Sequence, residues 1–381
     1  MALQSSGAIS LANIQTEFGG SNPISLSEYY AGGSYVPSGT SGTNGAVPTS
    51  GTITFNQFYG TSAIPRGQVE YTTPGTYYFI VPAGVTSVCG VAVGGGSGGP
   101  SGSRYGAGSG GGLAYKNNIS VTPGARLRVV VGAGGAGGAA TSYPYGNPGT
   151  AGGPSYLFWN EGPPGAWSNA ISAFAGQASY AYGDTPAGLG VGGDDGVKYG
   201  GAGRWAPTFG FEYIRWGGGG GAAGYSDNGG AGGPTSIYDL GGESGRGGGG
   251  GGGMFAIGND EGQNPYTSVW GKGASTGGGG VGIYGQGSNG GGGQWAGQIV
   301  TGGGGGSGGQ TAPSRTRNDG YDSGEDGGPG GAYGGGGASG SAWVGYPGSP
   351  IWRKGGDGGG GAVRIIWGPG RSFPSINTGN V

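Results

Sequence analysis

The sequence predicts a mainly β protein with three parts: a small antiparallel β-sandwich closed by a C-terminal strand, a large inserted bundle of polyglycine II-like rods, and an N-terminal region of short helices. Three observations lead to this prediction. Glycine makes up 113 of the 381 residues and gathers in long runs. Apolar residues alternate through an early segment, as they do in strands, and one more strand pattern stands alone near the C-terminus. The predicted regions are 1–64, 65–135 completed by a strand at 362–368, 136–361, and a tail at 369–381.

Composition argues against several functional classes. Charged residues make up 9% of the chain, the net charge is −2 and no basic run is present, so we expect no nucleic-acid partner. No apolar run approaches the roughly 18 residues of a membrane span, so we expect no membrane insertion, and the first residues lack the features of a secretory signal. The chain has no histidine, and its single Cys89 suits a buried apolar position. We therefore expect no cofactor, no metal centre and no enzyme activity.

A short repeat organises residues 1–64. Three segments share Ile, then Ser or Thr, then Leu or Phe, followed by polar residues: Ile9–Ile14, Ile24–Tyr30 and Ile53–Gly60. Ser25 with Glu28, and Thr54 with Gln57, have the spacing of a capping box. Ser10 is expected to cap the first copy without such a partner. The pattern predicts three helices of one to two turns.

Helices this short are marginal by themselves. We therefore expect this region to fold against another subunit or another part of an assembly, with an independent helical cap as the alternative. The residues expected to make the attachment are Leu11, Ile14, Phe18, Leu26, Tyr29, Phe55 and Phe58.

The second region reads as a series of strands separated by Pro-Gly and Ala-Gly turns. The predicted strands are Gln68–Tyr71, Tyr77–Val81, Val85–Val93, Leu113–Val121 and Arg126–Val131. The pattern at Ala362–Trp367 lies far along the chain, and we expect it to pair back with these strands and close the sandwich.

The third region contains repeated glycine runs, at Gly217–Gly221, Gly247–Gly253, Gly277–Gly280, Gly290–Gly293, Gly302–Gly306, Gly334–Gly337 and Gly358–Gly361. An extended helix with three residues per turn has no internal hydrogen bonds, so its backbone groups can bond to neighbouring chains on all sides. Only glycine lets such backbones approach closely. The runs therefore predict a bundle of polyglycine II-like rods, with a flexible Gly/Ser linker as the alternative.

Both ends of the chain resemble a known family. The start, with "SLANIQTEFGG" and "ITFNQFYG", looks like the start of many tailed-bacteriophage virion and tail proteins. The segments "VPAGVTSV", "VTPGARLRVVVGAGGAGG" and "GGDGGGGAVRIIWGPG" resemble the glycine-rich domain of phage tail fibres and tail adhesins. In those adhesins the resemblance implies a polyglycine II sandwich whose loops touch a host receptor. Residues 140–355 match no individual loop of that family, so the receptor class does not carry over.

Aromatic, mostly uncharged loops between the rods are the predicted receptor contacts, because Tyr and Trp offer rigid contact area at low entropic cost. The alternative is that these rings only cover the rods. The candidates are Tyr143, Tyr145, Trp159, Trp167, Tyr180, Tyr182, Trp205, Phe209, Phe211, Trp216, Phe255, Tyr266, Trp270, Trp343, Tyr346 and Trp352. The acidic loop 318–326 could hold calcium, although a solvated loop paired with Arg315 and Arg317 is the expected state.

These observations favour a non-enzymatic virion protein, a tail fibre or fibre-tip adhesin that presents loops to a host-surface glycan or an outer-membrane protein. The N-terminal region would bind other virion proteins. One alternative is a capsid decoration or fibre-shaft protein without a receptor. Another is a depolymerase that would use Asp194 and Asp195, although no cleft is predicted there. A homotrimer is possible, but no heptad pattern requires one.

Overall fold

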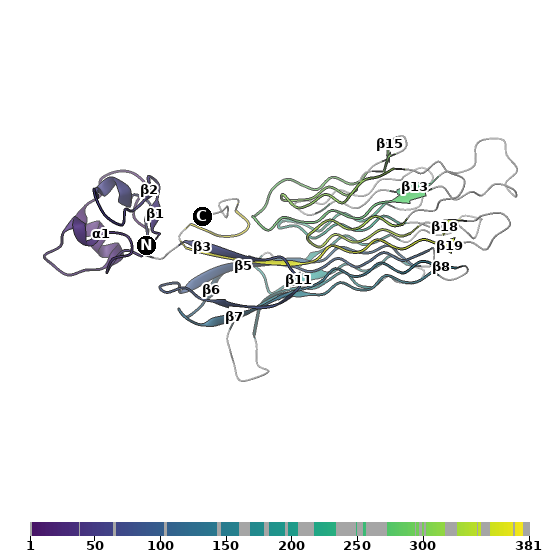
Figure 1. Cartoon of the computed structure of the whole chain (residues 1–381), viewed down its shortest axis with the longest axis horizontal. Coiled ribbons are helices and arrows are strands. Elements are labelled where there is room, and N and C mark those ends of the chain that lie inside the picture. Colours follow the sequence, from purple (N-terminus) through teal and green to yellow (C-terminus); the bar gives the residue numbers. More distant parts are fainter. Residues whose placement is uncertain are drawn as a thin grey trace, which may run out of the picture.

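In the computed structural model the chain is elongated, with the short helices at one end, two β-sheets in the middle and glycine-rich segments running to the other end (Figure 1). This architecture confirms the mainly β, antiparallel fold expected from the sequence. The structure describes residues 2–37, 39–63, 66–102, 105–142, 146–159, 168–178, 183–194, 197–204, 217–233, 249, 254–256, 273–293, 295–296, 299–300, 302–316, 326–340, 342–343, 351–368 and 370–375.

The N-terminal region contains the three predicted helical turns and one small hairpin. Its elements are α1 (Leu11–Phe18), the 3-10 turns η1 (Leu26–Glu28) and η2 (Phe55–Phe58), and the paired strands β1 (Ser41–Gly42) and β2 (Gly45–Ala46).

The capping differs in detail from the prediction. Asn13 completes a box at α1, because its N–H donates to Ser10 Oγ (3.2 Å) and its Oδ1 accepts from the Ser10 N–H (2.9 Å). The predicted box at η2 is present, with the Thr54 N–H donating to the Gln57 side chain at 2.7 Å. At η1, Ser25 Oγ instead accepts from the Ser27 N–H.

This region has its own hydrophobic core, which corrects the expectation that it needs a partner to bury its apolar residues. The core joins residues from all three helical turns: Ile14, Phe18, Tyr29, Ala31, Val36, Val47 and Phe58. The Phe18 and Phe58 rings meet edge to face at 6.1 Å. Four predicted attachment residues are therefore turned inward, and Leu11 and Leu26 are half-buried against them. Of the seven candidates only Phe55, at 39% exposure, faces outward.

Two antiparallel sheets form the sandwich. The first has the order β3 (Gly67–Tyr71), β20 (Ala362–Trp367), β5 (Ser87–Val93), β6 (Leu113–Ser120). The C-terminal strand β20 lies between β3 and β5, where Val363 is opposite both Tyr71 and Ala92. The prediction that this distant strand closes the sandwich is confirmed, and Val363 and Ile365 are fully buried in the core between the sheets.

The second sheet is larger than the sequence predicted. Its order is β12 (Lys198–Tyr199), β11 (Leu189–Val191), β10 (Ser168–Ala173), β9 (Ser155–Trp159), β7 (Arg126–Val131), β4 (Gly75–Ile80). Strands β9 to β12 come from the region expected to hold only rods and loops. Leu157 and Ile171 are fully buried between the two sheets, so these segments form strands because they complete the sandwich core.

Several strands continue directly into extended glycine-rich segments, which we call rods. The rod 94–100 follows β5, the rod 132–138 follows β7, the rod 146–154 precedes β9, and the rod 353–361 precedes β20. Other rods include 106–112, 217–223, 276–282 and 334–340. Together they form the bundle that we call the glycine lattice (Figure 1).

Hydrogen bonding in the rod 94–100 repeats every three residues. The N–H groups of Gly94 and Ser97 donate to the carbonyls of Gly112 and Ser109, respectively, on one neighbouring rod. Those of Gly95 and Gly98 donate to Gly153 and Thr150 on a second rod. Those of Gly96 and Gly99 donate to Gly359 and Gly356 on a third rod. The carbonyls of the same rod accept hydrogen bonds from three further segments of chain. The donors are the N–H groups of Gly176 on the first segment, of Gly135 and Gly138 on the second, and of Gly337 and Gly340 on the third. A rod with six hydrogen-bonded neighbours and a three-residue period is the arrangement predicted for polyglycine II-like rods.

Close packing explains why glycine is required in this lattice. A Cβ atom added at Gly98 would lie 2.1 Å from the Ala136 carbonyl oxygen, and one added at Gly111 would lie 2.0 Å from the Gly94 oxygen. These neighbours are backbone atoms of hydrogen-bonded rods, so they cannot rotate away as a side chain could. Most interior positions of the lattice therefore require glycine, and a few admit a small side chain, as at Ser97 and Ser109, which are fully buried.

Rods at the margin admit side chains at defined positions. In the rod 132–138 and the residue after it, Ala133, Ala136 and Ala139 are exposed, whereas Gly135 and Gly138 are buried. In a helix with three residues per turn, every third residue lies on the same side. A side chain at every third position thus marks a rod with one open side.

Candidate functional site

Three short sheets lie at the end of the lattice away from the N-terminal region (Figure 1). They are β8 (Thr141–Ser142) with β18 (Ala342–Trp343) and β19 (Ile351–Trp352), β13 (Met254–Ala256) with β14 (Gly273–Ser275), and β15 (Trp295–Ala296) with β16 (Ile299–Val300) and β17 (Arg315–Thr316). Each pairs the two ends of a connection between rods, so the rods bring separate loops to one end of the molecule.

Most of the predicted receptor contacts lie outside the described residues. These are Tyr143, Tyr145, Trp167, Tyr180, Tyr182, Trp205, Phe209, Phe211, Trp216, Tyr266, Trp270 and Tyr346. For Trp159, Phe255 and Trp343 the structure gives the strand on which each residue lies. Phe255 and Trp343 are on β13 and β18 at the lattice end.

The structure describes the anchoring points of several of these loops. Ser142 on β8 pairs with Ile351 on β19, so the described residues that border the segments 143–145 and 344–350 lie side by side. Elsewhere the Thr185 N–H donates to the Gly203 carbonyl at 2.8 Å, and Asp184 forms a 3.0 Å ion pair with Arg204. The described residues that border the segments 179–182 and 205–216 therefore lie on neighbouring rods.

Two of the tryptophans predicted as receptor contacts do not lie on exposed loops between rods. Trp352 is 2% exposed, and a Cβ added at Gly102 would lie 2.7 Å from its Cδ2 atom. Its ring packs over this glycine because no side chain stands in the way, so Trp352 follows the alternative in which aromatic rings cover rods. Trp159 ends β9 in the six-stranded sheet. It therefore lies in the sandwich and not on a loop between rods.

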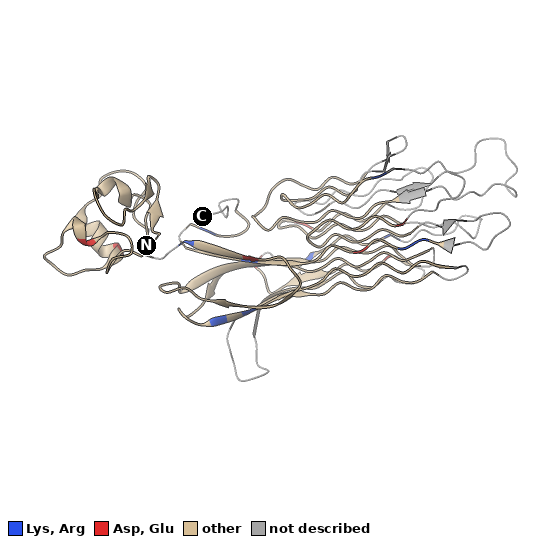
Figure 2. Ribbon diagram, in the orientation of Figure 1, with Lys and Arg blue, Asp and Glu red and all other residues tan. Residues whose placement is uncertain are grey.

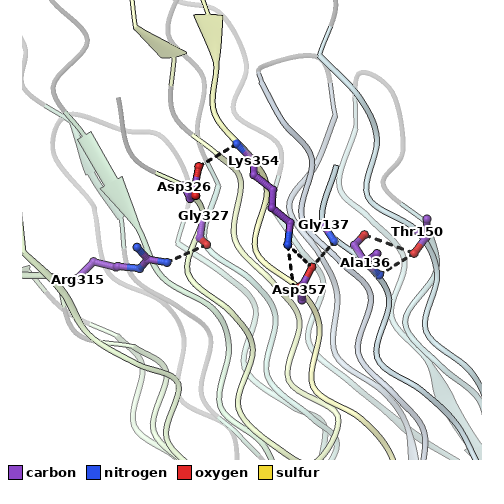
Figure 3. A network of polar contacts seen from close by, with 8 residues as sticks. All are labelled: Ala136, Gly137, Thr150, Arg315, Asp326, Gly327, Lys354 and Asp357. Carbon is purple, nitrogen blue, oxygen red and sulfur yellow. Dashed lines mark hydrogen bonds and ion pairs between the residues drawn. The ribbon is translucent and has the colours of Figure 1, made fainter. Parts of the chain in front are cut away.

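Polar side chains complete the hydrogen bonding at one margin of the lattice (Figure 3). The Gly137 N–H donates to Asp357 Oδ1 at 2.8 Å, and the Ala136 N–H donates to Thr150 Oγ1 at 2.7 Å. Lys354 lies three residues before Asp357, on the same side of its rod, and their charged groups are 3.0 Å apart. Side chains thus take the place of missing neighbouring rods.

The same contacts set the charge of Asp357. Partial burial by itself would raise the pKa of its carboxyl group. The hydrogen bond from Gly137 and the ammonium group of Lys354 outweigh this effect and hold the pKa below its ordinary value. Asp357 therefore stays an ionised acceptor at neutral pH.

A second polar cluster joins the sandwich to the lattice. Arg364, on β20, is fully buried; its Nη1 donates to the Ile283 carbonyl at 3.2 Å and its Nε lies 3.5 Å from Glu70 Oε1. Its guanidinium lies 4.3 Å from the ring centre of Tyr284, whose hydroxyl donates to Glu70 Oε2 at 2.8 Å. That hydrogen bond and partial burial raise the pKa of Tyr284.

Nearby Arg371 shares the Gln68 side-chain oxygen with Arg364. Burial, with repulsion from Arg364 and Arg66, lowers the pKa of Arg371 to about 10, so it is still charged at neutral pH. Arg364 is not among the functional residues predicted from the sequence. Its signal was an arginine inside the apolar strand "AVRIIW", a position that requires a buried partner.

The described residues contain no group of three or more His, Cys, Asp or Glu side chains that could hold a metal ion. Most of the acidic loop 318–326 lies outside them; within it, Asp326 Oδ1 accepts from the Lys354 N–H at 3.1 Å. No described helix is long and apolar enough to cross a bilayer. Chemically, the described part of the lattice offers rigid positioning of the loops at its end.

Comparison with known proteins agrees with the lattice. The family model described as "Glycine-rich domain" matches residues 72–264, just over half of the 381-residue chain, and covers sandwich strands and rods together. No curated protein matches the sequence. With a glycine lattice built on a β-sandwich and this match over half of its length, the chain belongs to the glycine-rich domain family.

Proposed function

We propose that this protein is a non-enzymatic bacteriophage virion protein, a tail fibre or fibre-tip adhesin. In this proposal the N-terminal region binds other virion proteins, and the loops at the far end of the lattice contact a host-surface glycan or an outer-membrane protein. The observation that carries the proposal is the common end at which the three short sheets β8-β19-β18, β13-β14 and β15-β16-β17 lie, away from the N-terminal region (Figure 1).

Preorganised loops would favour receptor binding. Loops that are ordered before binding lose less conformational entropy when a receptor docks. A lattice whose rods each bond to several neighbours holds the ends of those loops in fixed positions. Tyr and Trp, which are frequent in these segments, give large contact areas with few rotatable bonds.

Attachment through the N-terminal region needs a surface other than its core. Phe55, at 39% exposure, is the predicted attachment residue that remains available for a partner. Because the core is already closed, the region can fold first and bind afterwards.

The location of the protein tests the proposal. Intact particles are labelled with gold-conjugated antibody against residues 140–355 and viewed by electron microscopy. Gold at distal tail positions is expected. Gold spread over the head would instead indicate a capsid decoration protein, and absence of gold from every particle would contradict the virion assignment.

Receptor contact is tested separately. The purified chain is expected to compete with phage for adsorption to host cells. Replacing Trp343 and Tyr346 by serine should reduce this competition, whereas Tyr199→Ser should not, because Tyr199 is 46% exposed on β12 of the sandwich. Equal competition by both variants would indicate that the β18–β19 loop makes no contact with the receptor.

A further inference from the structure

The N-terminal region is joined to the rest of the chain by one covalent connection, which leads into strand β3. Residues 64 and 65 of this connection lie outside the described residues, and β3 starts at Gly67. Figure 1 shows β3 at the end of the sandwich that faces the N-terminal region, while the lattice leads away from the opposite end. A pull that follows the chain from one end of the molecule to the other therefore enters the sandwich through β3.

The register of β3 decides how it resists such a pull. Among the described strands, β3 lies at the edge of the four-stranded sheet, next to β20. Five residue pairs join the two antiparallel strands, and the first residue of β3, Gly67, is opposite the last residue of β20, Trp367. The N-terminal region pulls on β3 at Gly67, whereas the rod 353–361 pulls on β20 at Ala362, at the other end of the paired stretch. All five pairs are then loaded together, in shear, and cannot be peeled apart one by one.

Side chains block the sliding that shear would cause. The Trp367 ring packs over Gly67, where an added Cβ would lie 2.2 Å from its Cζ2 atom. The centre of the same ring lies 5.2 Å from that of Phe79, on β4 of the other sheet. Val69 and Tyr71 pack against the buried core between the sheets. β3 therefore cannot slide along β20 without displacing side chains from both sheets.

Glu70 links the middle of β3 to β20 and to the lattice. Charged residues make up only 9% of the chain, and Figure 2 shows some of them along these paired strands. Glu70 Oε1 lies 3.5 Å from Arg364 Nε on β20, and Glu70 Oε2 accepts from the hydroxyl of Tyr284 at 2.8 Å. A shift of two residues along the strand would move this carboxylate by about 7 Å and break both contacts.

The segment 370–375, which follows β20, holds the start of β3 in place. Arg371 is 8% exposed, and its guanidinium donates from Nη1 to the Gly67 carbonyl and from Nη2 to Gln68 Oε1 at 3.0 Å. Hydrogen bonds from a charged donor are stronger than those between neutral groups. Arg371 therefore holds β3 at the residue where a pull enters the sandwich.

Phe373 fixes the same segment to the sandwich and to the lattice. Its side chain is 3% exposed, and its ring is stacked on that of Tyr225, which follows the rod 217–223, with 6.0 Å between the ring centres. Its N–H donates to Asn117 Oδ1 on β6 at 2.9 Å, and its carbonyl accepts from Asn117 Nδ2 at 2.7 Å. Arg371 thus belongs to a segment that is itself anchored to two other parts of the fold.

We propose that β3, β20 and the segment 370–375 form a shear clamp that carries mechanical load between the N-terminal region and the lattice. This role rests on the proposed function for the origin of the load, because an adhesin that is bound to a virion and to a host cell is pulled at both ends. The resistance of the clamp is a property of the fold and is measured without virion or host. A chain that fails to label particles or to block adsorption would keep the clamp, and the reverse also holds.

Pulling the full chain in optical tweezers, in two geometries, tests the proposal. The handles are attached at Arg66→Cys and Lys354→Cys for shear, and at Thr72→Cys and Lys354→Cys for peeling, since Thr72 follows the other end of β3. All three positions are exposed, and Cys89 is buried, so it is not labelled. At the same constant force, unfolding in shear should be at least about tenfold slower than in peeling, because several hydrogen bonds must break together.

Arg371→Gln separates a mechanical role from a general loss of stability. In the shear geometry it should speed unfolding several-fold, since the hold on Gly67 is lost. In the peeling geometry it should have little effect, because peeling starts at the opposite end of β3. Arg126→Gln, which removes an exposed arginine from β7 of the other sheet, is the matched control and should change neither rate.

The proposal is overturned if the chain unfolds equally fast in the two geometries, a comparison that requires no substitution within β3, β20 or 370–375. It is also overturned if Arg371→Gln changes both rates by the same factor, since Arg371 would then contribute only to overall stability. An effect of Arg126→Gln in shear as large as that of Arg371→Gln would likewise contradict a clamp at this position.

Discussion

Strands β5 and β7 belong to different sheets of the sandwich and are separated by buried side chains such as Ala92, Leu157 and Val129. A few residues further along, the rods that continue these strands are hydrogen-bonded to each other, with the Gly135 N–H donating to the Gly96 carbonyl at 2.9 Å. The same two stretches of chain are thus held together first by a hydrophobic layer of about 10 Å and then by direct backbone contacts.

The comparison teaches that two kinds of packing have opposite sensitivities. The sandwich gains stability from side-chain volume, so it is weakened when a methyl group is removed. The lattice gains stability from close backbone approach, so it is weakened when a methyl group is added. Four predictions, taken from the largest expected effect to the smallest, test this contrast.

The largest effect is expected from Gly98→Ala in the lattice interior. The new Cβ would lie 2.1 Å from the Ala136 oxygen and 2.3 Å from its carbonyl carbon. Because both are backbone atoms, we expect a loss of about 3 kcal/mol or more in the free energy of unfolding, measured by urea denaturation.

Gly360→Ala is the matched control. Gly360 lies on a rod of the same glycine lattice, but a Cβ added there would have its nearest neighbour, the Gly132 carbonyl oxygen, at 3.9 Å. We expect a change within about 0.5 kcal/mol. If the two variants lose equal stability, close packing is not the reason for the glycines.

The second prediction removes one methyl group from the sandwich. Ile365 is fully buried between the sheets, and Ile365→Val should cost about 1 kcal/mol. The same denaturation experiment compares one methyl removed here with one methyl added at Gly98. A cost at Ile365 as large as that at Gly98 would contradict the proposed difference between the regions.

The third prediction is a gain of stability at the margin of the lattice. The Gly134 N–H lies one rod turn from Gly137 and has no hydrogen-bond acceptor among the described residues, and a Cβ at Gly360 would be 4.0 Å from its nitrogen. Asp357 stands three residues before Gly360 and accepts from Gly137. Gly360→Asp should therefore add an equivalent bond.

We expect Gly360→Asp to increase the free energy of unfolding by about 0.5–1 kcal/mol. Gly360→Ala again serves as the control, since it adds the Cβ without an acceptor. A gain that is the same for both variants would come from backbone entropy and would count against the new hydrogen bond.

The smallest expected effect is a pH dependence at Asp357. Its pKa in the folded protein is depressed, so the ionised carboxylate stabilises the fold above its ordinary pKa of about 3.8, and this contribution is lost as the pH falls through the folded value. Asp357→Asn keeps the oxygen that accepts from Gly137 but cannot ionise.

The stability difference between the parent protein and Asp357→Asn should be constant from pH 5 to 7 and shrink below about pH 4. Thermal unfolding across this range measures it. A difference that does not change with pH would mean that the charge of Asp357 contributes nothing to the fold.

Much of the sandwich could be predicted from local patterns. The strands β3 to β7 and β20 follow apolar alternation and Pro-Gly turns, and the pairing of β20 follows from its isolation in the sequence. Strands β9 and β10 are not predicted from the sequence, because Trp159 is expected on an aromatic loop between rods and Ile171 lies in the region expected to hold only rods and loops. Only the burial of Leu157 and Ile171 shows the role of these strands.

The site was less predictable. Trp352 and Trp343 stand on paired strands in similar aromatic segments, yet Trp352 is buried over Gly102, and nothing local in the sequence indicates this contact. In the N-terminal region the repeat predicted the three turns, but the burial of Phe18 and Phe58 in one core depends on how those turns pack together.

The sequence by itself determined that the chain would contain rods, and where some of them have open sides. Glycine at most positions permits the three-residue helix, and the spacing of Ala133, Ala136 and Ala139 marks an exposed side. Only the tertiary structure decided which rods are neighbours. Most interior positions of the rods are glycines that present nearly the same backbone surface, so few side chains there can specify a partner or a register. The strands that lead into the rods make most of that choice through the hydrophobic core they share.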